Sequence, residues 1–138
     1  MTRFLSPAWV ERFNELTASH RVALPGPEAG LAAQSGAFTM AELVQGGPEG
    51  EICTLVRVDG GRVSMALVDP DAAGQADVAV RLSWDDAVAL SQGRLAPYQA
   101  LAGGRIRVRG DLSVLAAAHG ALGELQPLVA QLQAETTY

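Results

Sequence analysis

The side chains that could perform acid–base or nucleophilic chemistry are few and widely spaced. The two histidines, His20 and His119, lie far apart in the sequence, and a histidine near the end of a helix is favourable for the helix dipole. Asp85 and Asp86 form a pair, but both fall in the first turn of an expected helix, where the dipole favours acidic residues. Nothing near Cys53 in the sequence would lower its thiol pKa. Because the HExxH, CxxC, P-loop, GxGxxG and GxSxG patterns are also missing from the sequence, we predict no catalytic residue, no metal site and no cofactor.

Three arginines, Arg105, Arg107 and Arg109, alternate with apolar residues and would share one face of a strand. One interpretation is a clamp for an anion or for the carboxylate of an acyl chain. The other is a solvated face whose arginines pair with acids on neighbouring strands. The candidate acids are Glu42, Glu51 and Asp59. We favour the second interpretation, which gives these arginines no role in ligand binding.

The stretch from Ala76 to Leu112 shows which elements would position such residues. Apolar residues alternate from Val78 to Leu82, which is typical of a half-buried strand. Ser83 stands where a helix N-cap belongs, and Pro97 fits the first turn of a second, shorter helix. Alternation returns over 105–109. The pattern therefore predicts a strand, two short helices and a further strand.

Local signals outline the rest of the chain. Ser6 can cap a first helix, and Gly60-Gly61 predicts a tight hairpin turn between antiparallel strands. Asp111 can cap a helix that Gly120 weakens, and Pro127 breaks or kinks the C-terminal helical segment. The expected elements are a helix at 7–18, loops over 19–36 and 70–75, strands at 38–45, 51–59 and 62–68, a helix at 112–119 and a second helix toward residue 134.

Composition limits the classes of function. The 138 residues suit a single domain spanning 1–138, and 49% of them are hydrophobic against 18% charged. The net charge of −5 provides no basic field for nucleic acid. The sequence has no apolar run of transmembrane length and no apolar signal core at its N-terminus, so we expect no membrane span and a cytoplasmic location. The apolar surplus could line a cavity or form a homodimer interface.

A family resemblance rests on a series of segments in the second half of the chain and on two turns before them. They are the strand entry Ala76–Val78, Trp84–Gly93, Leu95–Gly103, Gly104–Leu112, and the turns at Gly46–Glu51 and Asp59–Val63. Their order and spacing resemble the sterol carrier protein-2 (SCP2) lipid-binding family over about residues 36–132. The resemblance implies an α+β fold: a five-stranded, largely antiparallel sheet with helices packed on one face, enclosing an apolar cavity. It also implies that the C-terminal helix closes this cavity.

For function, the resemblance implies non-covalent binding or transfer of a hydrophobic, lipid-like molecule in an internal apolar tunnel. The ligand would be a fatty acyl chain, a sterol or a polyketide. The expected ligand-binding residues are Phe38, Met40, Met65, Trp84, Leu90, Tyr98, Leu101, Ile106, Val108, Leu115, Leu122, Leu125 and Val129. Tyr98 could offer its hydroxyl to the ligand's polar group, although core packing is the simpler role for both Tyr98 and Trp84.

Two alternative functions stay open at this point. The cavity could fold a hydrophobic biosynthetic intermediate for cofactor-free cyclisation or isomerisation, with Tyr98 and His119 as candidate polar groups. The apolar surplus could instead belong to a protein-interaction module. Turnover of a hydrophobic metabolite would identify the first, and a concentration-dependent mass without bound lipid would identify the second.

Overall fold

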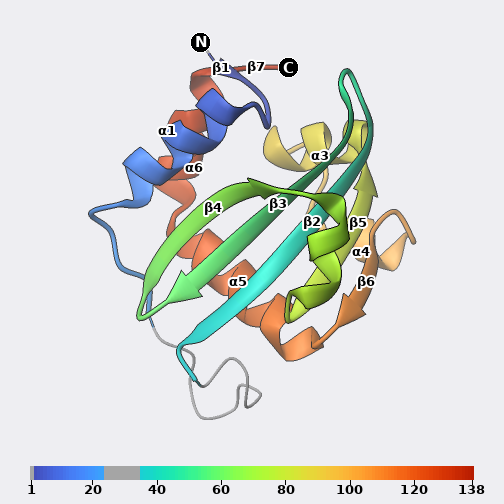
Figure 1. The fold of residues 1–138 in the computed structure, drawn as a ribbon. Helices are drawn as coiled ribbons and strands as arrows, with labels where there is room; N and C mark the ends of the chain where they lie inside the picture. Colours follow the sequence, from blue (N-terminus) through green and yellow to red (C-terminus); the bar gives the residue numbers. More distant parts are fainter. Residues whose placement is uncertain (1, 24–34) are drawn as a thin grey trace.

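A five-stranded sheet with a layer of helices on one face forms the fold (Figure 1). The computed structural model describes residues 2–23 and 35–138. The strands are β2 (Ala37–Gly47), β3 (Gly50–Asp59), β4 (Arg62–Val68), β5 (Val78–Ser83) and β6 (Arg107–Gly110), in the order β4-β3-β2-β5-β6 across the sheet. Neighbours are antiparallel except β2 and β5, which run parallel. The predicted α+β fold with a largely antiparallel sheet is confirmed, and its parallel central pair makes the sheet mixed.

β2 and β5 run parallel because the chain crosses from β4 to β5 over the outer face of the sheet, which is the face opposite the helical layer. After the β2-β3-β4 meander, the 3₁₀ helix η1 (Pro70–Gln75) carries the chain back across the sheet to β5. We predicted a loop here, but Asp69 caps a short helix by accepting a backbone N–H of the first turn at 2.9 Å. Ala73 of η1 packs with Ala41 and Leu43 of β2. Other elements therefore cover β2 on both faces.

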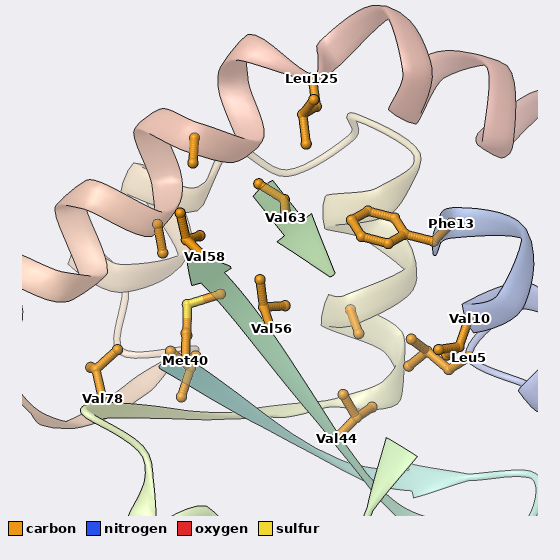
Figure 2. Close-up of a cluster of buried hydrophobic side chains, with 14 of the residues drawn as sticks. Leu5, Val10, Phe13, Met40, Val44, Val56, Val58, Val63, Val78 and Leu125 are labelled. Atoms are coloured by element: carbon orange, nitrogen blue, oxygen red, sulfur yellow. The ribbon is translucent and has the colours of Figure 1, made fainter. Parts of the chain in front are cut away.

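The main core lies between the inner face of the sheet and the helices. Figure 2 shows Met40 and Val44 of β2 beside Val56 of β3 on this inner face. Phe13 and Leu125 approach them from the helical side. Each such side chain, fully buried, contributes about 1.5–3 kcal/mol through removal of apolar surface from water.

Capped helices form the inner layer. They are α1 (Pro7–Thr17), α3 (Trp84–Ser91), α4 (Pro97–Ala102), α5 (Leu112–Glu124) and α6 (Gln126–Ala134). The side chains of Ser6, Ser83 and Asp111 each accept a backbone N–H of the first turn, at 3.2, 3.1 and 2.9 Å. Pro7 and Pro97 occupy first turns, where the missing N–H removes no helical bond. The predicted caps are confirmed.

The C-terminal helices differ from the prediction. α5 continues through Gly120 to Glu124 instead of ending near residue 119. Its buried residues Val114 and Ala118 belong to the main core, and this packing outweighs the roughly 1 kcal/mol that a glycine costs in a helix interior. The helical segment does break next to Pro127: α5 ends at Glu124 and α6 starts at Gln126, with Pro127 in its first turn.

The turns agree more closely with the sequence. Gly60 and Gly61 form the expected hairpin turn with φ of +58° and +84°, a conformation that suits glycine. β6 begins at Arg107 rather than Arg105, because the Arg105 N–H donates to the Ala100 carbonyl at the end of α4 at 2.9 Å. Most of the loop predicted over 19–36 lies outside the described residues.

The two ends of the chain meet in a small parallel sheet that the sequence did not predict. β1 (Thr2–Arg3) pairs with β7 (Thr136–Thr137). Nearby, the Trp9 indole Nε1–H donates to the Thr136 hydroxyl at 3.0 Å, a buried bond between α1 and the C-terminal strand. The α1 helix is thereby fixed against α6 (Figure 1).

Candidate functional site

An apolar cavity of about 480 Å³ lies between the inner face of the sheet and the helical layer. Its lining comes from β2, β3, β4 and β5, from helices α1, α3, α5 and α6, and from the segments that flank α4. Pro97 and Gln126 line it and are exposed. The cavity therefore opens to the surface between α4 and the start of α6.

The structure brings seven of the thirteen expected ligand-binding residues together on this lining. They are Met40, Met65, Leu90, Ile106, Leu115, Leu122 and Val129. These residues come from the sheet, from the segment before β6 and from three helices, so they surround the cavity from both layers. Their contact with a ligand stays a prediction.

The other six expected residues take different places. Phe38 and Leu125 are buried in the core, and Trp84 and Val108 are half-buried against it. Tyr98 and Leu101 lie on α4 with 80% and 46% of their surface exposed. Neither belongs to the part of the cavity lining that the structure describes. The short α4 helix turns Ala100 inward, and this leaves the Tyr98 ring in solvent.

Residues near the N-terminus also line the cavity, and sequence reasoning did not include them. They are Phe4, Leu5, Trp9 and Phe13. The resemblance began at about residue 36, so it said nothing about this segment. Its only signal was the helical spacing of Trp9 and Phe13, which predicts a buried helix face but does not say what that face covers.

Glu42 is a carboxylic acid on the cavity lining, at the centre of the sheet. It follows Met40 by two residues and precedes Val44 by two, so it points to the inner face of β2. Among the described residues its carboxyl group has no hydrogen-bond or ion-pair partner. Burial raises the pKa of Glu42, because removal from water disfavours its charged form.

Thr54 is a second polar residue on the same lining. Its side chain is 1% exposed, and its hydroxyl makes no hydrogen bond within the described chain. It shares the inner face of β3 with Val56 and Val58. The sequence signal for both residues was a polar side chain in the apolar phase of a strand, and we gave it no weight.

The predicted partners of the arginine stripe were wrong. β6 is an edge strand paired with β5, where Arg107 lies opposite Arg81 rather than an acid. Arg105 pairs instead with Asp86 at 3.4 Å, and Glu42 faces the cavity. All three stripe arginines are exposed, as a solvated face requires. None of them lies on the described cavity lining, so the structure shows no arginine clamp there.

The remaining candidates for chemistry are dispersed. Cys53 is buried, and burial, together with the charges of Glu51 and Glu42, raises its thiol pKa. His119 lines the cavity and is exposed, whereas His20 lies in the exposed segment after α1. Over residues 2–23 and 35–138, no group of histidine, cysteine and acidic side chains could hold a metal ion. No helix in that part of the chain is long and apolar enough to cross a bilayer.

A second hollow, of about 550 Å³, lies beside α1 at the sheet edge and has a different character. Asn14, Arg57, Asp59 and Arg62 are among the residues that line it. A lining so rich in charged and amide groups suits water better than an apolar ligand. The apolar cavity is therefore the candidate site.

The sequence was compared with known protein families. The profile of the SCP-2 sterol transfer family matches residues 30–123, more than half of the chain. The chain belongs to this family. The membership confirms the resemblance drawn from the segments around Ala76–Leu112. A comparison with curated proteins finds no match.

Solved structures share the fold of the SCP-2 family member described here. The crystal structure of sterol carrier protein 2 matches over 98% of this chain and 100% of its own, with a TM-score of 0.65 and 16% identity. The solution structure of a conserved hypothetical protein from Thermus thermophilus matches over 96% of this chain and 91% of its own, with a TM-score of 0.63 and 20% identity. The solution structure of palmitated SCP2L2 from Aedes aegypti matches over 88% of this chain and 90% of its own, with a TM-score of 0.51 and 19% identity.

Proposed function

We propose that this SCP-2 family protein binds and transfers a hydrophobic, lipid-like molecule held in the cavity between sheet and helices. The observation that carries the proposal is the cavity itself. Its volume of about 480 Å³ falls within the range of small-molecule sites, and its lining is mostly apolar. The solution structure of a relative is described as palmitated, which supports a ligand with a long hydrocarbon chain.

The physical basis of binding is burial of hydrocarbon. Each methylene removed from water contributes about 0.8 kcal/mol, so about ten buried methylenes contribute ~8 kcal/mol. Lost freedom of the ligand and of the protein offsets part of this. Without that offset, ~8 kcal/mol corresponds to a dissociation constant of about 1 μM. The offset makes binding weaker than this, which allows release. We propose Met40, Leu115 and Val129 among the residues that contact the hydrocarbon.

Titration with a neutral, apolar fluorescent dye such as Nile red tests the proposal. Wild type should bind the dye saturably at micromolar concentration, and native mass spectrometry should show hydrophobic molecules retained during purification. A Leu115→Trp variant fills the cavity from α5 and should weaken dye binding at least about tenfold.

The matched control is Leu112→Trp, because Leu112 lies on the same helix and is 64% exposed. This variant should bind the dye as wild type does. If folded wild type shows no saturable binding at tens of micromolar, or if both variants bind equally well, the cavity is not a lipid site.

A further inference from the structure

Two polar side chains stand next to each other in the apolar lining. Glu42 of β2 and Thr54 of β3 are direct partners in the antiparallel register. Opposite residues in such a pair project from the same face of a sheet with Cβ atoms roughly 5 Å apart. Both line the cavity, on its sheet side. A small molecule in the cavity could therefore contact both at once.

Residues 2–23 and 35–138 provide neither group with a hydrogen-bond partner. The Thr54 hydroxyl is buried without a hydrogen-bond partner, and the Glu42 carboxyl has none among the residues the structure describes. Unpaired buried polar groups destabilise a fold. Apolar residues at both positions would complete the surface formed by Met40 and Val56. A molecule that enters the cavity could provide this partner.

The charges around the pair indicate the chemistry of that partner. On the described lining the titratable groups are Glu42 and His119, and the arginines lie elsewhere. A free carboxylate placed beside Glu42 would meet a like group with no arginine to neutralise it. A hydroxyl group instead both donates and accepts. It can donate to a Glu42 oxygen in either protonation state and accept from the Thr54 hydroxyl.

We propose that Glu42 and Thr54 together bind the hydroxyl group of the cavity's ligand, which is accordingly a lipid-like alcohol rather than a free fatty acid. This inference rests on the proposed function and specifies its ligand class. The apolar lining holds the ligand's hydrocarbon. The Glu42–Thr54 pair selects the ligand's polar group and fixes how deeply the ligand lies in the cavity. Burial raises the pKa of Glu42. This is compatible with the role, because the protonated acid can still accept a hydrogen bond from the ligand's hydroxyl group.

Matched ligands test the inference without any mutation. Dodecanol, its methyl ether, dodecanoate and dodecylammonium share one chain and differ in the polar group. Each is titrated against bound Nile red at neutral pH. Dodecanol should displace the dye up to about tenfold more effectively than the ether, which cannot donate, and more effectively than dodecanoate.

Variants then assign the preference to the pair. Glu42→Leu and Thr54→Val should each reduce the advantage of dodecanol over the ether toward parity, while Nile red still binds. Glu42→Gln keeps a hydrogen-bonding group of similar shape and should retain most of the advantage. Glu51→Gln is the control, because Glu51 is exposed, and it should behave as wild type.

The outcomes separate this inference from the proposed function. Dye binding with equal displacement by alcohol, ether and acid would overturn the inference and leave lipid binding intact. Tightest binding of dodecylammonium would overturn it in favour of a cation site at Glu42. A preference for alcohol that survives Glu42→Leu and Thr54→Val would overturn the assignment to this pair. Absence of dye binding would overturn the proposed function and the inference with it.

Discussion

Glu42 lies on the inner face of β2, where the alternation of the strand predicts an apolar side chain. Its neighbours on the inner face, Met40 and Val44, are buried in the main core. A carboxyl group there lowers the stability of the empty protein, because the charged form loses hydration without gaining a partner. Such a departure from the apolar pattern supports the proposal that Glu42 binds a ligand.

Glu42→Gln should therefore raise thermal stability in a pH-dependent way. The pKa of Glu42 is raised above 4.5 in the folded state, so folding favours the protonated acid. Stability present below pH 4.5 is lost as the pH rises through the folded pKa. The variant and wild type should have similar melting temperatures near pH 4, and the variant should melt increasingly higher as the pH rises above 5.

Circular dichroism melts between pH 4 and 8 measure this difference. His119 also lies on the described lining, but it is present in both proteins, so the difference between them reports on Glu42. The Cys53 thiol, whose pKa is raised above 9.0, stays protonated over this range. A difference in melting temperature that stays constant, or that narrows with rising pH, would contradict a raised pKa for Glu42.

Tyr98→Phe should change the dye affinity by no more than about twofold. It should leave the free energy of unfolding unchanged. The sequence suggested that the Tyr98 hydroxyl meets the ligand, but the side chain is 80% exposed on α4. Removing a solvated hydroxyl leaves no buried group unpaired. Nile red titration compares the variant with wild type, with Leu115→Trp as the positive control. A tenfold loss of affinity would place Tyr98 against the ligand.

The sequence predicted those helix ends and turns that depend on interactions within a few residues. The caps at Ser83 and Asp111 and the Gly60-Gly61 turn are each specified within a few residues, and all three are present. The extent of α5 and the pairing of β2 with β5 depend on packing between distant segments. The family resemblance named cavity residues such as Met40, whereas the contribution of Trp9, which precedes the segments that carry the resemblance, needed the tertiary structure.

Gly120→Ala should stabilise the protein by about 0.5–1 kcal/mol. Gly120 lies inside α5, is exposed, and has open space where a Cβ would stand. Alanine has the higher helix propensity and lowers the entropy of the unfolded chain. Urea unfolding measures the change.

The matched comparison for Gly120 is Gly61→Ala, which should destabilise. Gly61 has a φ of +84°, and an added Cβ would lie 2.9 Å from the Val22 carbonyl oxygen. Stabilisation at position 61, or destabilisation at position 120, would contradict the backbone conformations that the structure assigns to α5 and to the hairpin.

The two ends of the chain together line one side of the cavity. Phe4 and Trp9 line it from the N-terminal segment, and Val129 and Leu132 line it from α6. The β1–β7 pair and the packing of the Phe4 ring on Trp9, with centroids 5.2 Å apart, hold these ends together. We therefore expect the contact between α1 and α6 to influence the rate of ligand release.

Thr136→Val tests this linkage. Trp9 is 7% exposed, and its indole N–H donates to the Thr136 hydroxyl at 3.0 Å. Valine has a similar shape but no acceptor, so the indole N–H stays buried and unpaired at a loss of about 1–3 kcal/mol. Because Trp9 and Leu132 both line the cavity, the dye should also dissociate faster from the variant.

Thr137→Val is the control for this change, since Thr137 is the exposed neighbour in β7 and should leave both quantities unchanged. Urea unfolding and stopped-flow release of Nile red provide the two measurements. Deleting residues 121–138 would be less informative, because it also removes the buried Leu125 and Leu132 from the core. Loss of stability with an unchanged release rate would show that α6 supports the fold without gating the cavity. Faster release in both variants would show that the Trp9–Thr136 bond is not what controls it.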